Sequence, residues 1–190
     1  NGVITDANGL PAVDSATGFF QSSAKSFWST SVDGANIPVG GAAQQLPNWD
    51  ISATPHRNVY TYIGANPASP VNLASSVNYE VSTANTLLNM TSLGTTTAAA
   101  ATLVINYARG EDLRDENGNQ LTTDTRHTMG DPLHAQPAAV IYGGTTASPD
   151  VTDGVIYAAE NDGFLHAIST VTGTELWSFV PQDVLLTLRA

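Results

Sequence analysis

The chain has 190 residues, a formal net charge of −11 and only 12% charged residues, and Lys25 is its single lysine. A chain of this length can form one domain or one and a half around a core. Its acidity excludes a nucleic-acid partner, because phosphate binding needs clustered lysine and arginine. The absence of cysteine excludes disulfides, thiolate metal sites and cysteine nucleophiles.

The composition also predicts where the protein acts. No run approaches the roughly eighteen apolar residues that span a bilayer, so no membrane span is expected. Many small polar residues and few basic ones are common in exported bacterial surface proteins, which favours an exported protein. The chain opens at Asn1 without a methionine or a signal peptide, and we expect this start to be a processing site or a boundary.

Residues 1–110 are predicted to be an irregular, β-leaning lead-in. Turn-forming residues dominate 1–18, and the aromatic residues that follow are expected to be buried. These aromatic residues are Phe19, Phe20, Phe27 and Trp28. Residues 57–64 alternate between apolar and polar side chains, which predicts a short strand.

A helical pair is predicted within this lead-in, at about 82–108. Ala84, Leu87 and Leu88 have the i, i+3, i+4 spacing of one helix face, and Gly94 has the position of a C-terminal cap. The second helix begins in the alanine run of 98–101, because alanine is the best helix former, and Gly110 closes it.

Residues 111–127 are predicted to be a polar loop. Four of its side chains offer oxygen ligands for calcium: Asp115, Asn117, Asn119 and Asp124. Gly118, however, is at the fourth position of an EF-hand-type loop and not at the sixth, and no glutamate stands at the twelfth. A solvated turn is therefore favoured, with a calcium site as the alternative.

Four short strands are predicted in the last third of the chain, at 138–142, 154–160, 164–169 and 175–180. Glycine-containing turns separate them, at 143–144, 161–163 and 172–173. Both faces of this sheet are apolar, because Leu165 and Ala167 alternate with Phe164 and Ile168. A sheet of this kind needs a cover on each side.

Residues 128–190 are therefore predicted to be the first blade of a β-propeller, truncated before its neighbouring blades. The expected fold class is mainly β with a small helical element. A partial propeller at the C-terminal end follows an irregular flanking segment.

The run from Gly154 to Ile168, followed by Thr172 to Trp177, resembles the repeat of quinoprotein-type propellers. The resemblance implies that Asp162 and Gly163 form the hairpin turn, that Gly173 adopts a left-handed turn conformation and that Trp177 packs between blades. Enzymes, assembly factors and adhesins share this repeat, so it specifies a fold and not a function.

Segments before and after the repeat resemble type IV pilus tip adhesins of the PilY kind. The resemblance runs in order from about Phe27 to the C-terminus. Its segments are Phe27-Trp28, Asp33-Gly34, 40–43, Leu46-Pro47, 57–62, 104–107, Arg109-Gly110, Arg126-His127, 129–134 and 177–181. It implies a non-enzymatic role in pilus biogenesis and adhesion, at a pilus tip, cell surface, outer membrane or periplasm of a Gram-negative cell.

The implied partners are minor pilins, other pilus components, and a host or abiotic surface. The propeller of this family is linked to a calcium loop, so the resemblance implies calcium in the parent protein. No match to that loop occurs in this chain, and no cofactor or catalytic residue is predicted here.

Two other functions share the repeat. A quinone-cofactor dehydrogenase is the enzymatic alternative, and the absence of cysteine and of a clustered carboxylate metal site argues against it. A scaffold of outer-membrane assembly is the other. Among the histidines, His166 is predicted to be packed and neutral, and His134 is predicted to close a loop near Asp131 by hydrogen bonding.

Overall fold

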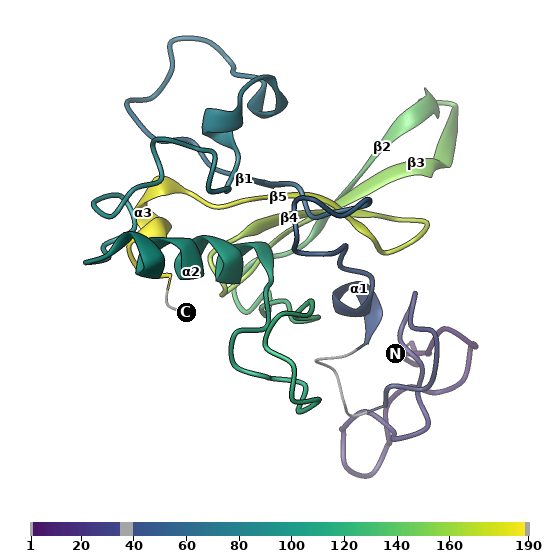
Figure 1. The fold of residues 1–190 in the computed structure, drawn as a ribbon. Helices are drawn as coiled ribbons and strands as arrows, with labels where there is room; N and C mark the ends of the chain where they lie inside the picture. The colour runs from purple at the N-terminus through teal and green to yellow at the C-terminus, as the bar shows by residue number, and fades with distance from the viewer. Residues whose placement is uncertain (1, 35–39, 189–190) are drawn as a thin grey trace.

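The computed structural model describes residues 2–34 and 40–188. Three segments lie outside these ranges: residue 1, residues 35–39 and residues 189–190. They include the first residue of the predicted lead-in and the last two residues of the predicted blade. The fold is mainly β, as predicted, and its centre is one open five-stranded mixed sheet with the order β1-β5-β4-β3-β2 (Figure 1). The strands are β1 (Val59–Tyr60), β2 (Ala138–Thr145), β3 (Ser148–Ala159), β4 (Leu165–Ser169) and β5 (Glu175–Phe179). The helical elements are α1 (Gly41–Gln44), η2 (Leu73–Ser75), η3 (Val77–Tyr79), α2 (Ala98–Arg109) and α3 (Gln182–Leu185).

Strands β2 to β5 form an antiparallel meander, which confirms the four predicted strands. The first hairpin is longer than expected, because β2 continues through Gly143 and Gly144 to Thr145. A register shift between Ile141 and Gly143 takes up this irregularity. A bulge at such a shift bends the strand and increases its local twist.

Strand β1 joins the other edge of the sheet, where it pairs in parallel with β5. Backbone hydrogen bonds from Ser178 to Asn58 and from Val180 to Tyr60 hold the pair together. The Thr61 hydroxyl adds a bond to the Val180 carbonyl at 2.8 Å. Residues of the lead-in and of the predicted blade therefore share one sheet.

The two faces of this sheet are covered to different extents. Ala158, His166, Ser178 and Val59 stand opposite one another across β3, β4, β5 and β1, and all four are buried. This face, called the covered face below, packs against α2 and α3 (Figure 1). The core on this side contains Val59, Val81, Leu88, Leu93, Ala101, Val104, Ile105, Ala108, Phe164, Val180, Leu185 and Leu188.

The opposite face, called the open face, carries Tyr157, Ala167 and Trp177 in one cross-strand row. Tyr157 and Trp177 are partly exposed, as are Leu165 and Phe179 beside them. The predicted apolar character of both faces is confirmed, but full cover is found on one face alone among the described residues. A single open sheet is not by itself a propeller.

The prediction of the first helix of the pair is wrong. Residues 82–94 form successive turns, because asparagine side chains bond to the backbone just ahead of them. The Asn85 carboxamide accepts the Leu87 N–H at 2.9 Å, and that of Asn89 accepts the Thr91 N–H at 3.0 Å. Local bonds of this kind compete with the helical hydrogen-bond ladder. Leu88 and Leu93 still reach the core from these turns.

The second helix of the pair is confirmed as α2. The Thr97 hydroxyl accepts the Ala100 N–H at 3.1 Å, and Gly110 ends the helix with a left-handed φ of 106°. Within the described residues, no helix has the length and apolar character needed to cross a bilayer.

The expected burial of the N-terminal aromatic residues is largely wrong. Phe19, Phe20 and Phe27 are 76%, 50% and 62% exposed on a segment of turns and isolated bridges, which lies apart from the sheet (Figure 1). Trp28, by contrast, is partly buried, and its indole N–H donates to the Thr170 carbonyl at 3.3 Å. A segment this short cannot by itself form a core that encloses three phenylalanines.

Candidate functional site

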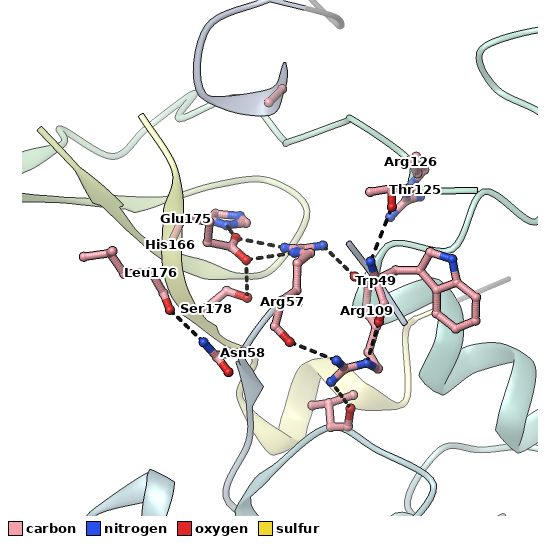
Figure 2. Close-up of polar contacts among 12 residues, drawn as sticks. Trp49, Arg57, Asn58, Arg109, Thr125, Arg126, His166, Glu175, Leu176 and Ser178 are labelled. Atoms are coloured by element: carbon pink, nitrogen blue, oxygen red, sulfur yellow. Dashed lines mark hydrogen bonds and ion pairs between the residues drawn. The ribbon is translucent and has the colours of Figure 1, made fainter. Parts of the chain in front are cut away.

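Five ionisable side chains meet at the covered face of the sheet. Arg57 precedes β1, Glu160 and Asp162 lie in the turn between β3 and β4, His166 lies on β4, and Glu175 begins β5. We call this set the buried charge cluster. Figure 2 shows the Arg57 guanidinium directed at Glu175, with His166 beside it. The sheet register places His166 next to Ser178 on β5, and this brings it close to Glu175.

The strongest contact of the cluster joins Arg57 and Glu175. Arg57 Nε and Nη2 donate to the two Glu175 oxygens, each at 2.8 Å, in a bidentate pair. The side chains are 5% and 1% exposed. Burial alone would raise the pKa of Glu175, but the charges of Arg57 and His166 and their hydrogen bonds lower it to about 2. Glu175 is therefore an anion at neutral pH.

His166 lies between two carboxylates. Its Nδ1 is 2.6 Å from Glu175 Oε2, and its Nε2 is 3.0 Å from Asp162 Oδ2. Burial alone would lower the pKa of His166, but the bonds to Asp162 and Glu175 outweigh it and raise the pKa to about 9. The prediction of a packed histidine is confirmed. The prediction of a neutral one is wrong, because both ring nitrogens face acceptors.

Glu160 completes the cluster and is its least satisfied member. Its Oε2 is buried without a hydrogen-bond partner among the described residues, 3.6 Å from His166 Nε2. Burial raises the pKa of Glu160 to about 7, although the charge of His166 opposes this shift. Glu160 and Asp162 together form a carboxylate pair beside a histidine. From the sequence we expect no clustered carboxylate metal site, and the structure does place these two carboxylates together beside a histidine.

A second buried arginine fixes the position of Arg57. Arg57 Nη1 donates to the Arg109 carbonyl at 3.1 Å, and Arg109 Nη2 donates to the Arg57 carbonyl at 2.9 Å (Figure 2). Arg109 also donates to the carbonyls of Trp49 and Val81. This reciprocal contact ties the C-terminal end of α2 to the start of β1, and so sets where the guanidinium of Arg57 meets Glu175.

The geometry limits the chemistry that His166 can perform. A serine-type nucleophile needs a histidine nitrogen that is free to take its proton. Both nitrogens of His166 face carboxylates, and no hydroxyl of the described residues bonds to either. Arg57 and Asp162 also border a cavity of about 450 Å³, which Glu116 and Arg126 line as well. Such an arrangement is suited to holding protons or a cation at the edge of this cavity.

The polar loop is closed by its own side chains. Asn117 and Asn119 donate to Asp124 Oδ2 at 3.0 and 2.7 Å, and Asp115 accepts the Gln120 N–H at 3.0 Å. The side-chain oxygens of Asn117 and Asn119 accept backbone N–H groups within the loop. The structure thus brings three of the four proposed calcium ligands together, and their contacts are mainly those of a self-bonded turn, with Asp124 Oδ1 left without a hydrogen-bond partner among the described residues.

The residues of the propeller repeat adopt the predicted turn geometry. Asp162 Oδ1 accepts the Phe164 N–H at 2.9 Å, and Gly163 and Gly173 have positive φ values of 89° and 71°. Trp177 lies on the open face, with its ring centroid 5.8 Å from that of Tyr157. The turn roles of Asp162, Gly163 and Gly173 are confirmed, and packing of Trp177 between blades stays a prediction. His134 is exposed.

Comparisons with models of known protein families, with curated proteins and with solved structures found no match. The site is therefore interpreted from its own chemistry. Sequence reasoning missed Arg57, Glu160 and Glu175, although one signal was present. Each is a charged residue at the border of an apolar strand, in a chain that has few charged residues. Such residues are seldom buried unless they are paired.

Proposed function

We propose that this chain is a non-enzymatic part of a type IV pilus tip adhesin of the PilY kind. In this role its sheet is the first blade of a quinoprotein-like β-propeller, and the protein acts in pilus biogenesis and surface attachment. It is exported to the cell surface, where minor pilins and other pilus components are its partners.

The observation that carries the proposal is the ordered set of PilY-like segments from Phe27 onward. The positive φ values of Gly163 and Gly173, at the two turns that the repeat requires, support the propeller part. So does the open face, because a blade needs apolar residues on the side that meets its neighbour. Trp177 and Tyr157 supply them.

The surface of the N-terminal segment supports a binding role over a catalytic one. Phe19, Phe20 and Phe27 expose large aromatic side chains, and Ile4 and Leu10 are exposed on the same segment. Exposed apolar groups of this kind are typical of surfaces that contact other proteins. At the buried charge cluster, His166 is engaged by carboxylates on both sides, which favours a structural or ion-holding role.

A pull-down with purified minor pilins tests the proposal. We expect the chain to retain them, whereas an unrelated protein of similar size and net charge does not. Two further experiments test the two other functions whose proteins share the repeat, the assembly scaffold and the dehydrogenase. Retention of outer-membrane assembly subunits in place of pilins would replace the proposal with the scaffold function. Cofactor absorbance and alcohol oxidation, after incubation with a quinone cofactor and calcium, would replace it with the dehydrogenase.

A further inference from the structure

We propose that Glu160, Asp162 and His166 bind a divalent transition-metal ion of the zinc class. The ligands are His166 Nε2 and one oxygen from each carboxylate, which all lie within 4.8 Å of one another. His166 Nε2 is 3.0 Å from Asp162 Oδ2 and 3.6 Å from Glu160 Oε2. In a tetrahedral zinc site with bonds of about 2.0–2.1 Å, neighbouring ligand atoms are about 3.3 Å apart. The two separations lie on either side of this value, so small movements would admit an ion.

The state of Glu160 is an independent sign of a missing ligand. Its side chain is only 7% exposed, and its Oε2 has no hydrogen-bond partner among the described residues. A buried carboxylate oxygen without a partner is costly. Among the described residues, Glu111 Oε2, Asp112 Oδ2 and Asp124 Oδ1 also lack a hydrogen-bond partner, but of these four oxygens only Glu160 Oε2 belongs to a residue grouped with a histidine and a second carboxylate. This oxygen is the atom of Glu160 that approaches His166 Nε2. An ion between the two atoms supplies the partner that the protein does not.

The other side of the His166 ring is prepared in the way that metal-binding histidines usually are. A histidine ligand commonly donates its second ring N–H to a carboxylate, which fixes the tautomer and the ring orientation. His166 Nδ1 has such a partner in Glu175 Oε2, at 2.6 Å. Glu175 is itself held by Arg57 through two bonds of 2.8 Å. With the proton on Nδ1, the lone pair of Nε2 is directed at Asp162 and Glu160.

The charges of the cluster also suit a divalent ion. With Glu160, Asp162 and Glu175 ionised, the cluster holds three negative charges, and Arg57 offsets one of them. One divalent cation beside a neutral His166 offsets the remaining two. The buried region is then neutral with the ion bound, as a low dielectric favours.

The ligand set favours zinc over calcium. Calcium takes six to eight oxygen ligands, whereas imidazole with carboxylates suits zinc and its neighbours. Three protein ligands leave one tetrahedral position for water or another group.

Glu160 also lines a cavity of about 390 Å³ together with Asp131 and His134, which gives an ion a route to the site. This inference does not depend on the pilus assignment.

Binding of Zn²⁺ alone to the purified chain tests the site. We expect one tightly bound ion, with X-ray absorption giving one nitrogen and two oxygen ligands at about 2.0–2.2 Å. Glu160→Gln keeps the shape of the side chain but removes its charge, and it should weaken zinc binding at least about tenfold. Circular dichroism checks that this variant is folded.

The control is Asp115→Asn in the polar loop, which should leave zinc affinity unchanged. Excess Ca²⁺ should not displace the zinc. The proposal is overturned if the unaltered chain binds no zinc, if Glu160→Gln binds it as tightly as the unaltered chain does, or if Ca²⁺ displaces it. A loss of binding in Asp115→Asn alone would move the site to the polar loop and overturn it as well.

Discussion

At the scale of single residues, the buried charge cluster is stabilised only while every charge keeps its partner. Arg57 and Glu175 are almost completely removed from water, and each satisfies the other through two hydrogen bonds. The mutual attraction in such a pair roughly repays its desolvation, so the pair as a whole adds little. Removal of one partner is different, because the other charge is then buried without compensation.

Glu175→Gln should therefore lower the free energy of unfolding by about 3–5 kcal/mol. It leaves the charge of Arg57 unpaired and replaces the carboxylate beside His166 with an uncharged amide. Urea denaturation followed by circular dichroism measures the loss. Glu116→Gln is the matched control, because Glu116 pairs with Arg126 at 3.5 Å on the surface, and its loss should cost less than about 1 kcal/mol. Equal effects in the two variants would contradict the pairing described for Glu175.

The cluster also predicts how stability changes with pH in metal-free buffer. The pKa of His166 is raised from 6.5 to about 9 and that of Glu160 from 4.5 to about 7. Between pH 4.5 and 9 the folded chain thus holds protons that the unfolded chain has released, so stability falls as pH rises. The pKa of Glu175 is lowered from 4.5 to about 2, so its contribution is lost as pH falls through that range.

We expect the cluster's contribution to be greatest near pH 4.5, and to decline above it by up to about 1.4 kcal/mol per pH unit for each proton held. Urea titrations at a series of pH values measure this decline. In the Glu160→Gln variant, the decline in stability between pH 4.5 and 7 should disappear, because it belongs to Glu160. The decline between pH 6.5 and 9 belongs to His166 and should remain. Stability that is constant from pH 5 to 9 in the unaltered chain would rule out the assigned proton positions.

At the scale of elements, the two predicted helices differ in what their side chains do to the backbone. Both segments carry apolar residues at helical spacing, and sequence reasoning therefore predicted both. Asn85 and Asn89 instead cap turns within 82–94, whereas the alanines of α2 offer no competing hydrogen bond. The apolar spacing was compatible with either outcome, and the position of the asparagines decided it.

The N-terminal cap of α2 can be tested directly. Thr97→Ala removes the hydroxyl that accepts the Ala100 N–H, and should lower stability by about 1 kcal/mol. Thr97→Ser keeps an acceptor at the same place and should restore most of the loss. Thermal unfolding of the three proteins measures the differences. If the serine variant is as unstable as the alanine variant, the methyl group of Thr97 matters and the cap does not.

The turn between β4 and β5 depends on Gly173 for two reasons. Its φ of 71° disfavours other residues, and a Cβ there would lie 2.5 Å from the Trp28 ring. Gly118 has a nearly equal φ of 72°, but a Cβ there would meet nothing within 4 Å. Gly173→Ala should therefore destabilise the fold by about 1–3 kcal/mol more than Gly118→Ala. Equal losses, measured by urea denaturation, would show that Trp28 does not pack on this turn.

At the scale of the whole molecule, the sequence predicts the strands that are joined by short turns, but it does not predict the long-range pairing that completes the sheet. Strands β3, β4 and β5 are joined by tight turns, so glycine positions and apolar alternation are enough to find them. The pairing of β1 with β5, and with it the contact of Arg57 with Glu175, joins residues 118 or 119 apart in the sequence. Neither residue carries a local sign of its partner. The contact of Arg57 with Glu175 was missed for this reason, although both residues are visible as charges beside apolar strands.

The open face is where the proposed propeller can be tested. Trp177 and Tyr157 are partly exposed there, although they are large and apolar enough to form part of a core. If a neighbouring blade covers this face, a longer parent chain should protect both side chains. Hydroxyl-radical footprinting with mass spectrometry reads each residue separately, and Trp177 should be labelled several-fold less in the longer chain. Phe19, which is exposed on the N-terminal segment, is the internal reference and should be labelled equally in both. Unchanged labelling of Trp177 would mean that no layer is added on this face, and the sheet would then be a finished structure with one side in water.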